Sequence, residues 1–158
     1  LRWLKQELVR NYPAIRFIGP DNQAEFGQWK IDLVCIYEAE KVAVEAKYKI
    51  RSDKAVPDNR KEAFLDLYKL ENCIKSSKYA NGLFLWLTNE PNYLHQATGD
   101  SKQFSTHQGR VYQPNTPLNA RRARRKMPLP LTLSGQYVFN WRRVLPKEQW
   151  YSLVLEVV

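Results

Sequence analysis

The sequence predicts an α/β domain in which a central mixed β-sheet is flanked by helices. Short apolar runs of strand length alternate along the chain with segments whose apolar residues recur at one-turn helical spacing. The length of 158 residues is enough for one hydrophobic core and too short for two ordinary domains. We therefore expect a single domain over residues 1–158, with its core in about residues 1–98 and a basic loop and terminal strands in residues 99–158.

The N-terminal part predicts one helix and the start of the sheet. Residues 1–12 carry leucines at one-turn spacing, and Pro13 should end that helix. A short strand at residues 15–18 is expected to lead into a turn at residues 19–22. Two β-rich runs follow at residues 31–37 and 42–48, and the short connection between them is typical of a hairpin.

The rest of the chain predicts one long helix and further strands. The helix is expected to follow Pro57, with Asn59 and Glu62 as a capping box. The apolar run at residues 83–87 is typical of a strand buried on both faces. The remaining elements are expected as a short helix from residue 91 to 94, a loop over most of residues 99–130, and strands at residues 137–141 and 151–157.

The basic residues are concentrated in one stretch. Between Asp100 and Glu148 there are ten basic residues and no acidic one, whereas the rest of the chain has 15 basic and 16 acidic residues. This concentration predicts a polyanionic partner, of which nucleic acid is the commonest, and a solvated basic loop is the alternative. The residues expected to contact nucleic acid are Arg110, Arg121, Arg122, Arg124, Arg125 and Lys126.

Cysteine usage and hydropathy bear on the cellular compartment. Cys35 and Cys73 lie in apolar or helical patterns, which predicts reduced core thiols in a cytoplasmic protein, with one disulfide as the alternative. No apolar run approaches the ~20 residues needed to cross a bilayer, so we expect no membrane anchor.

The hairpin should gather ionisable side chains on one face of the sheet. If Tyr37 pairs with Val42, then Asp32 lies opposite Lys47, and Glu45 lies one diagonal step away. Side chains alternate along a strand, so the three share a face. Two neighbouring carboxylates repel unless a cation lies between them. Mg²⁺, commonly held by one or two carboxylates with waters and substrate phosphates, is the natural cation.

These residues resemble the PD-(D/E)xK nuclease superfamily, which has the restriction-endonuclease-like fold. The match consists of Ile31 and Asp32 at the start of one apolar strand and of Val44-Glu45-Ala46-Lys47 on the next. It departs from the family pattern before Asp32, where Ile31 replaces Pro, and nothing specific to the family is found beyond about Leu87.

The resemblance implies a role for each matching residue. Asp32 and Glu45 would bind the metal, together with the carbonyl of Ala46, and Lys47 would hold or deprotonate the attacking water. Glu7 matches by location an acidic residue of the first helix that many members bring to the metal, and a solvated helix residue is the alternative. A solvated helix face is also the interpretation for Asp66, Lys69 and Cys73, although Lys69 lies where it could touch phosphate.

We therefore expect an Mg²⁺-dependent DNA endonuclease, a hydrolase that cuts phosphodiester bonds with metal-activated water and that Mn²⁺ could also support. A homodimer is a reasonable hypothesis, because cutting both strands of a duplex usually requires two active sites. One alternative is a noncatalytic nucleic-acid-binding module with an idle metal site. Another is a surface-facing hairpin on which Asp32, Glu45 and Lys47 form a cross-strand salt-bridge cluster.

Overall fold

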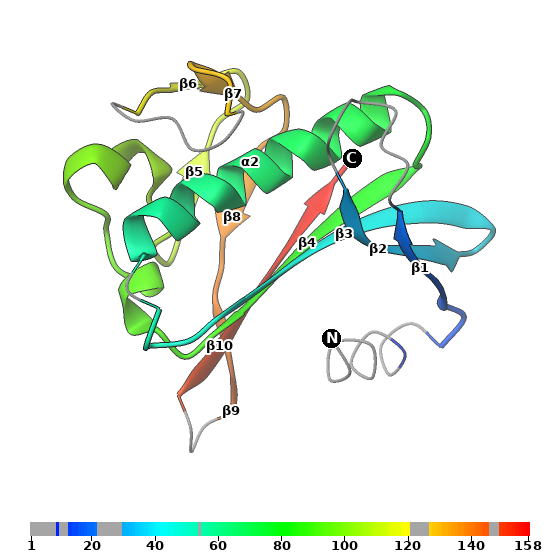
Figure 1. The fold of residues 1–158 in the computed structure, drawn as a ribbon, viewed down its shortest axis with the longest axis horizontal. Helices are drawn as coiled ribbons and strands as arrows, with labels where there is room; N and C mark the ends of the chain where they lie inside the picture. Colours follow the sequence, from blue (N-terminus) through cyan, green and yellow to red (C-terminus); the bar gives the residue numbers. More distant parts are fainter. Residues whose placement is uncertain (1–8, 10–12, 22–29, 54, 121–126, 146–148) are drawn as a thin grey trace.

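The computed structural model describes residues 9, 13–21, 30–53, 55–120, 127–145 and 149–158. In this part of the chain a mixed six-stranded sheet carries one long helix, α2 (Val56–Lys75), across one face (Figure 1). The strands in spatial order are β1 (Arg16–Asp21), β2 (Ile31–Tyr37), β3 (Glu40–Lys49), β4 (Asn81–Thr88), β10 (Trp150–Val157) and β9 (Arg142–Leu145).

The α/β class and the mixed sheet are confirmed, but among the described elements a single α-helix, α2, covers the sheet, on one face, where flanking helices are expected. β3 and β4 are parallel and α2 forms the crossover between them, whereas the other neighbouring strands are antiparallel. The helix expected at residues 1–12 falls outside the described residues except for Val9, which is helical. Within the described residues, no helix is both long and apolar enough to span a membrane.

The β2–β3 hairpin has a tighter turn than the sequence suggests. Tyr37 pairs with Glu40, so only Glu38 and Ala39 form the turn, with φ angles of 51° and 69°. Two consecutive residues at positive φ are typical of a type I′ hairpin turn, which fits the twist of the flanking strands. The expected pairing of Tyr37 with Val42 is therefore wrong by two residues. Because side chains repeat every two residues, this shift keeps each side chain on its expected face.

Each face of the sheet has its own apolar core. Phe84 and Trp86 of β4 pack in the core beneath α2, and Leu85 belongs to a smaller core on the opposite face. The strand expected to be buried on both faces is thus confirmed, and burying each such side chain contributes roughly 1.5–3 kcal/mol. Cys35 and Cys73 are buried free thiols in these cores.

Helix α2 begins one turn earlier than the sequence suggests. The backbone N–H of Asn59 donates to the Ala55 carbonyl at 2.8 Å, and its side-chain amide donates to the Tyr93 hydroxyl at 2.8 Å. Asn59 therefore lies inside the helix and the expected capping box is wrong. The early start is compatible with Pro57 in the first turn, where its missing N–H costs no helical hydrogen bond.

Two other local expectations also need correction. β1 continues through Gly19 to Asp21, with irregular pairing at Gly19, so residues 19–21 are not a turn. The region expected to be mostly loop contains short paired strands as well as turns. Just before this region, η1 (Pro91–Leu94) confirms the expected short helix. The other short elements within and after the region are η2 (Gly99–Phe104), β5 (Arg110–Tyr112), β6 (Pro117–Leu118), β7 (Leu131–Thr132) and β8 (Tyr137–Phe139).

These short elements pack on α2 through one aromatic cluster. The ring of Phe64 on α2 lies 5.4 Å from that of Phe104, 4.7 Å from that of Tyr112 and 5.6 Å from that of Phe139. Edge-to-face and stacked pairs of this kind contribute about 0.5–1.5 kcal/mol beyond area burial. Helix α2 is therefore held between the sheet and the described part of residues 99–139, which we call the C-terminal segment. This packing determines which side of the helix faces β3.

Candidate functional site

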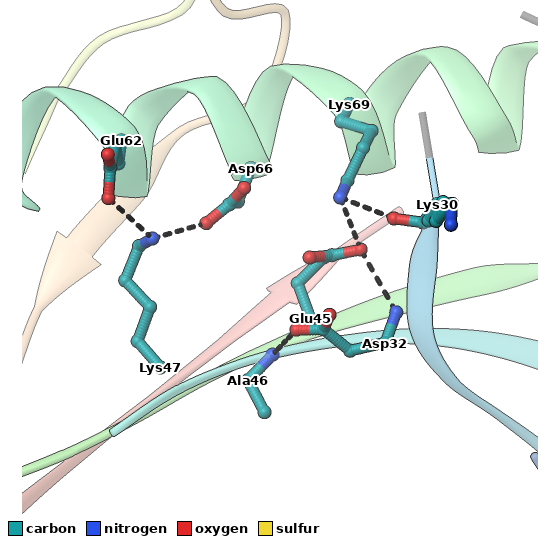
Figure 2. Close-up of polar contacts among 8 residues, drawn as sticks. All are labelled: Lys30, Asp32, Glu45, Ala46, Lys47, Glu62, Asp66 and Lys69. Carbon is teal, nitrogen blue, oxygen red and sulfur yellow. Dashed lines mark hydrogen bonds and ion pairs between the residues drawn. The ribbon is translucent and has the colours of Figure 1, made fainter. Parts of the chain in front are cut away.

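The two predicted carboxylate ligands lie on neighbouring strands, with exposed Asp32 at the start of β2 and buried Glu45 within β3. The Ala46 N–H donates to Asp32 Oδ2 at 3.0 Å, and the Asp32 N–H donates to Glu45 Oε1 at 3.4 Å. Asp32 is thus the neighbour of Glu45 across the strand pair, not of Lys47 as the expected register had it. Figure 2 shows Glu45 and Lys47 extending from β3 toward α2, with Asp32 beside Glu45.

Glu45 is almost fully buried and has a cation from the helix as its partner. Its side chain is 4% exposed, and Lys69 Nζ on α2 lies 2.6 Å from Glu45 Oε1. The same ammonium group donates to the Lys30 carbonyl at 2.7 Å. A carboxylate buried between a sheet and a helix requires such a partner, because an unpaired buried charge is strongly destabilising.

The surroundings of Glu45 favour its protonated form. Burial raises the pKa of Glu45 to about 8, and the negative charges of Asp66 and Asp32 act in the same direction. Lys69 opposes this shift. A carboxyl group whose pKa is strongly shifted next to specific charged partners is characteristic of functional sites, although structural ion-pair networks also shift pKa values.

Lys47 is held by the helix and not by a cross-strand pair. Its Nζ lies 2.7 Å from Asp66 Oδ2 and 3.8 Å from Glu62 Oε2, both on α2. Burial raises the pKa of Asp66, and the ion pair with Lys47 opposes that shift. Lys47 is 11% exposed at its side chain. Glu45 and Lys47 are thus largely covered and pair with α2, whereas Asp32 is exposed, so only Asp32 has the exposure that the surface-facing salt-bridge cluster requires.

Three residues of α2 therefore belong to the site that the sequence interpretation placed elsewhere. The sequence suggests a helix cap for Glu62 and a solvated helix face for Asp66 and Lys69. Both interpretations are wrong, because all three side chains contact residues of β3. Cys73, placed on the same solvated face, is buried in the core. Residues 62, 66 and 69 follow helical spacing on one face, and this face borders the apolar stripe at Ala63. That adjacency is the signal in the sequence that points to them.

The donor set fits Mg²⁺ in its chemistry. Among the described residues, no three His, Cys, Asp or Glu side chains are close enough together to surround one metal ion. Mg²⁺ needs only one or two protein carboxylates when waters and phosphates complete its octahedron, and Asp32 and Glu45 supply two hard oxygen donors. Four carboxyl groups lie around the ammonium groups of Lys47 and Lys69 (Figure 2), so the cluster is rich in the hard oxygen donors that Mg²⁺ binds.

The structure places only one of the other expected site residues, Arg110, and it is not part of this cluster. Glu7 and the basic residues at 121, 122, 124, 125 and 126 lie outside the described residues. Arg110 is exposed on β5, and its guanidinium carbon lies 4.9 Å from the ring centroid of Tyr112. It therefore lies on a different sheet from Asp32 and Glu45, within the C-terminal segment.

No family model matches the sequence, and no curated protein or solved structure matches it at a significant level.

Proposed function

We propose that this chain is a divalent-metal-dependent nuclease that hydrolyses phosphodiester bonds in DNA, with a site of the PD-(D/E)xK type. The observation that carries the proposal is the arrangement at Glu45. Asp32 of β2 lies next to Glu45 of β3, and two lysines reach the same space between β3 and α2. Few structural roles require two carboxylates to adjoin on neighbouring strands, because their mutual repulsion has to be compensated.

The carboxylates of Asp32 and Glu45 would hold the metal. The backbone N–H of Ala46 fixes the Asp32 carboxylate through the 3.0 Å hydrogen bond, so the two ligands are oriented by the strand pair itself. A bound Mg²⁺ supplies an activated water and offsets negative charge on the scissile phosphate. Both proposed ligands, Asp32 and Glu45, are on strands, which are rigid and position ligands more accurately than loops do.

Lys47 would act on the attacking water or on the phosphate. It follows Glu45 by two residues on β3, so both side chains point to the α2 side of the sheet. The ion pair with Asp66 holds the Lys47 ammonium group on the α2 side of the sheet. From that position Lys47 can donate hydrogen bonds to a phosphate oxygen or orient a water molecule, which are the roles proposed for it.

Charge supports nucleic acid as the substrate class. The chain carries a formal net charge of +9, and its excess of positive charge belongs to residues 101–147. Lys and Arg side chains that neutralise phosphates supply most of the sequence-independent affinity for DNA. A homodimer would supply the two active sites that cutting a duplex on both strands requires.

A noncatalytic nucleic-acid-binding module is the second candidate. The observation that favours it is that both lysines are already paired with carboxylates, as in a structural ion-pair network. Glu45→Gln and Lys47→Met separate the two functions. The nuclease proposal expects each variant to lose cleavage by at least 100-fold while its affinity for a DNA duplex stays within about threefold. A wild-type protein that binds the duplex but shows no cleavage at any Mg²⁺ or Mn²⁺ concentration would support the binding module.

A further inference from the structure

We propose that Lys69 is the resident counter-cation of the metal site, and that a divalent ion must displace its ammonium group from Glu45 to bind. The inference rests on the proposed function and adds the regulation of the same site. It makes the metal affinity of this chain depend on a residue of α2 that lies outside the motif on β2 and β3.

The geometry makes the two cations competitors for one atom. Glu45 Oε1 accepts the Lys69 ammonium group at 2.6 Å and also faces the Asp32 N–H at 3.4 Å. A metal ion shared by the carboxylates of Glu45 and Asp32 would therefore bind close to this oxygen and to the ammonium group on it. A metal ion and an ammonium group cannot both lie against this oxygen, because they repel each other strongly at such short range in a partly buried site.

The displaced ammonium group would keep other partners within reach. Lys69 Nζ already donates to the Lys30 carbonyl at 2.7 Å. The positive charge of Lys69 also acts on Asp66, the carboxylate one turn earlier on α2. When a metal ion replaces the Lys69 ammonium group at Glu45, the ammonium group therefore still has polar partners. An unpaired buried charge, which would strongly destabilise the protein, does not arise.

In the absence of a metal, Lys69 explains how the site remains folded. Glu45 is 4% exposed and Lys69 is 12% exposed at their side chains, so the ammonium group gives the Glu45 carboxyl group a hydrogen-bonding partner where water is largely excluded. Because Lys69 pairs with Glu45, the protein should stay folded at low metal concentration. For the same reason it should bind a metal ion more weakly than it would without Lys69.

The first test is Mg²⁺ binding by isothermal titration calorimetry without DNA, at pH 9. An alkaline pH limits competition between protons and the metal ion for the carboxylates. Lys69→Met removes the competing charge and should tighten Mg²⁺ binding about tenfold. Lys69→Arg, which keeps the charge, and Lys75→Met, on the exposed end of α2, should stay within twofold of wild type. Equal or weaker binding by Lys69→Met would overturn the inference.

A second measurement uses the wild-type chain and does not depend on whether Lys69→Met folds. The protein is treated briefly with acetic anhydride at pH 9, with and without saturating Mg²⁺, and modification of each lysine is quantified by mass spectrometry. Displacement from Glu45 should raise the acetylation rate of Lys69 at least threefold, while that of Lys75 is unchanged. An unchanged Lys69 rate under saturating metal would overturn the inference.

The outcomes also distinguish this inference from the proposed function. If wild type and Lys69→Met bind Mg²⁺ equally and Glu45→Gln abolishes binding, the metal site stands and the role of Lys69 is wrong. If Glu45→Gln binds Mg²⁺ as wild type does, the metal site itself is wrong and the inference falls with it.

Discussion

The ammonium group of Lys47 lies 2.7 Å from Asp66 on α2, although the nearest acidic residue in sequence is Glu45 on the same strand. The position of the proposed catalytic lysine is thus set by a helix that follows it in the chain. Glu62, one turn before Asp66, lies at 3.8 Å and can contribute only a weaker attraction.

Asp66 is therefore expected to act as a positioning residue for Lys47. Asp66→Asn should lower kcat for DNA cleavage at least tenfold with little change in KM, since the ammonium group loses its short ion pair; tenfold corresponds to about 1.4 kcal/mol. Glu62→Gln is the matched control and should lower kcat less than threefold. Single-turnover kinetics at saturating Mg²⁺ measure both. Equal losses in the two variants would show that the 2.7 Å pair has no special role.

The raised pKa of Glu45 predicts a pH dependence of stability in the metal-free protein. Its pKa is raised from 4.5 to about 8, so the native state holds a proton that the unfolded state has lost at any pH between these values. Stability must then fall as the pH rises from about 4.5 to about 8, and this contribution becomes constant above that range. Urea unfolding at pH 5, 6, 7 and 8 in EDTA measures the effect. Glu45→Gln should flatten the curve, and parallel curves for the two proteins would exclude Glu45 as the source.

Glu71 is expected to be the main polar anchor between α2 and the C-terminal segment. Its buried carboxylate accepts hydrogen bonds from the Ser134 N–H, the Gly135 N–H and the Tyr137 hydroxyl, all at 2.8 Å. Burial and the charge of Glu71 raise the pKa of Tyr137, which keeps the hydroxyl a donor. Glu71→Ala leaves these donors unpaired and should lower the free energy of unfolding by about 3 kcal/mol.

Urea denaturation measures the effect of Glu71→Ala, with the exposed Glu156→Gln on β10 as the control. The control should change stability by less than about 0.5 kcal/mol. A loss for Glu71→Ala as small as that of the control would show that the C-terminal segment is held by its aromatic contacts alone.

The basic segment at residues 121–126 is expected to bind the DNA backbone. Replacing its five basic residues with Gln should weaken duplex binding at low salt and reduce the slope of log K against log [salt] by about 0.9 for each phosphate that the variant no longer neutralises. Fluorescence anisotropy between 50 and 300 mM NaCl, roughly the range over which phosphate neutralisation dominates binding, measures both quantities. An unchanged slope would exclude this segment from the interface.

The sequence predicted the face of each hairpin side chain but not the pairing of the strands. Alternation placed Asp32, Glu45 and Lys47 on one side, and a two-residue error preserves that arrangement. The error arose at Glu38 and Ala39, which adopt positive φ angles without the Gly or Asn that usually indicates such a turn. Local sequence therefore carried no signal for the tight turn.

The sequence places Glu62, Asp66 and Lys69 next to the apolar stripe of α2 but does not show that they face the sheet. Charged residues on a helix are usually solvated, and only the packing of α2 on β3 turns Asp66 and Lys69 inward. The sequence also does not predict the short strands β5, β6 and β7, whereas β8 lies within the strand expected at residues 137–141. β6 and β7 contain two residues each, which is too short for an alternating pattern to be recognised.

The carboxylate pair of Asp32 and Glu45 is expected above all to support metal-dependent hydrolysis of DNA. The most direct test is a titration of Mg²⁺ against supercoiled plasmid, scored for nicked and linear products, with wild type and Glu45→Gln side by side. We expect nicking by the wild type that increases with Mg²⁺, stops in EDTA and is absent in Glu45→Gln. Absence of nicking by the wild type at every Mg²⁺ concentration, or equal nicking by Glu45→Gln, would contradict this expectation.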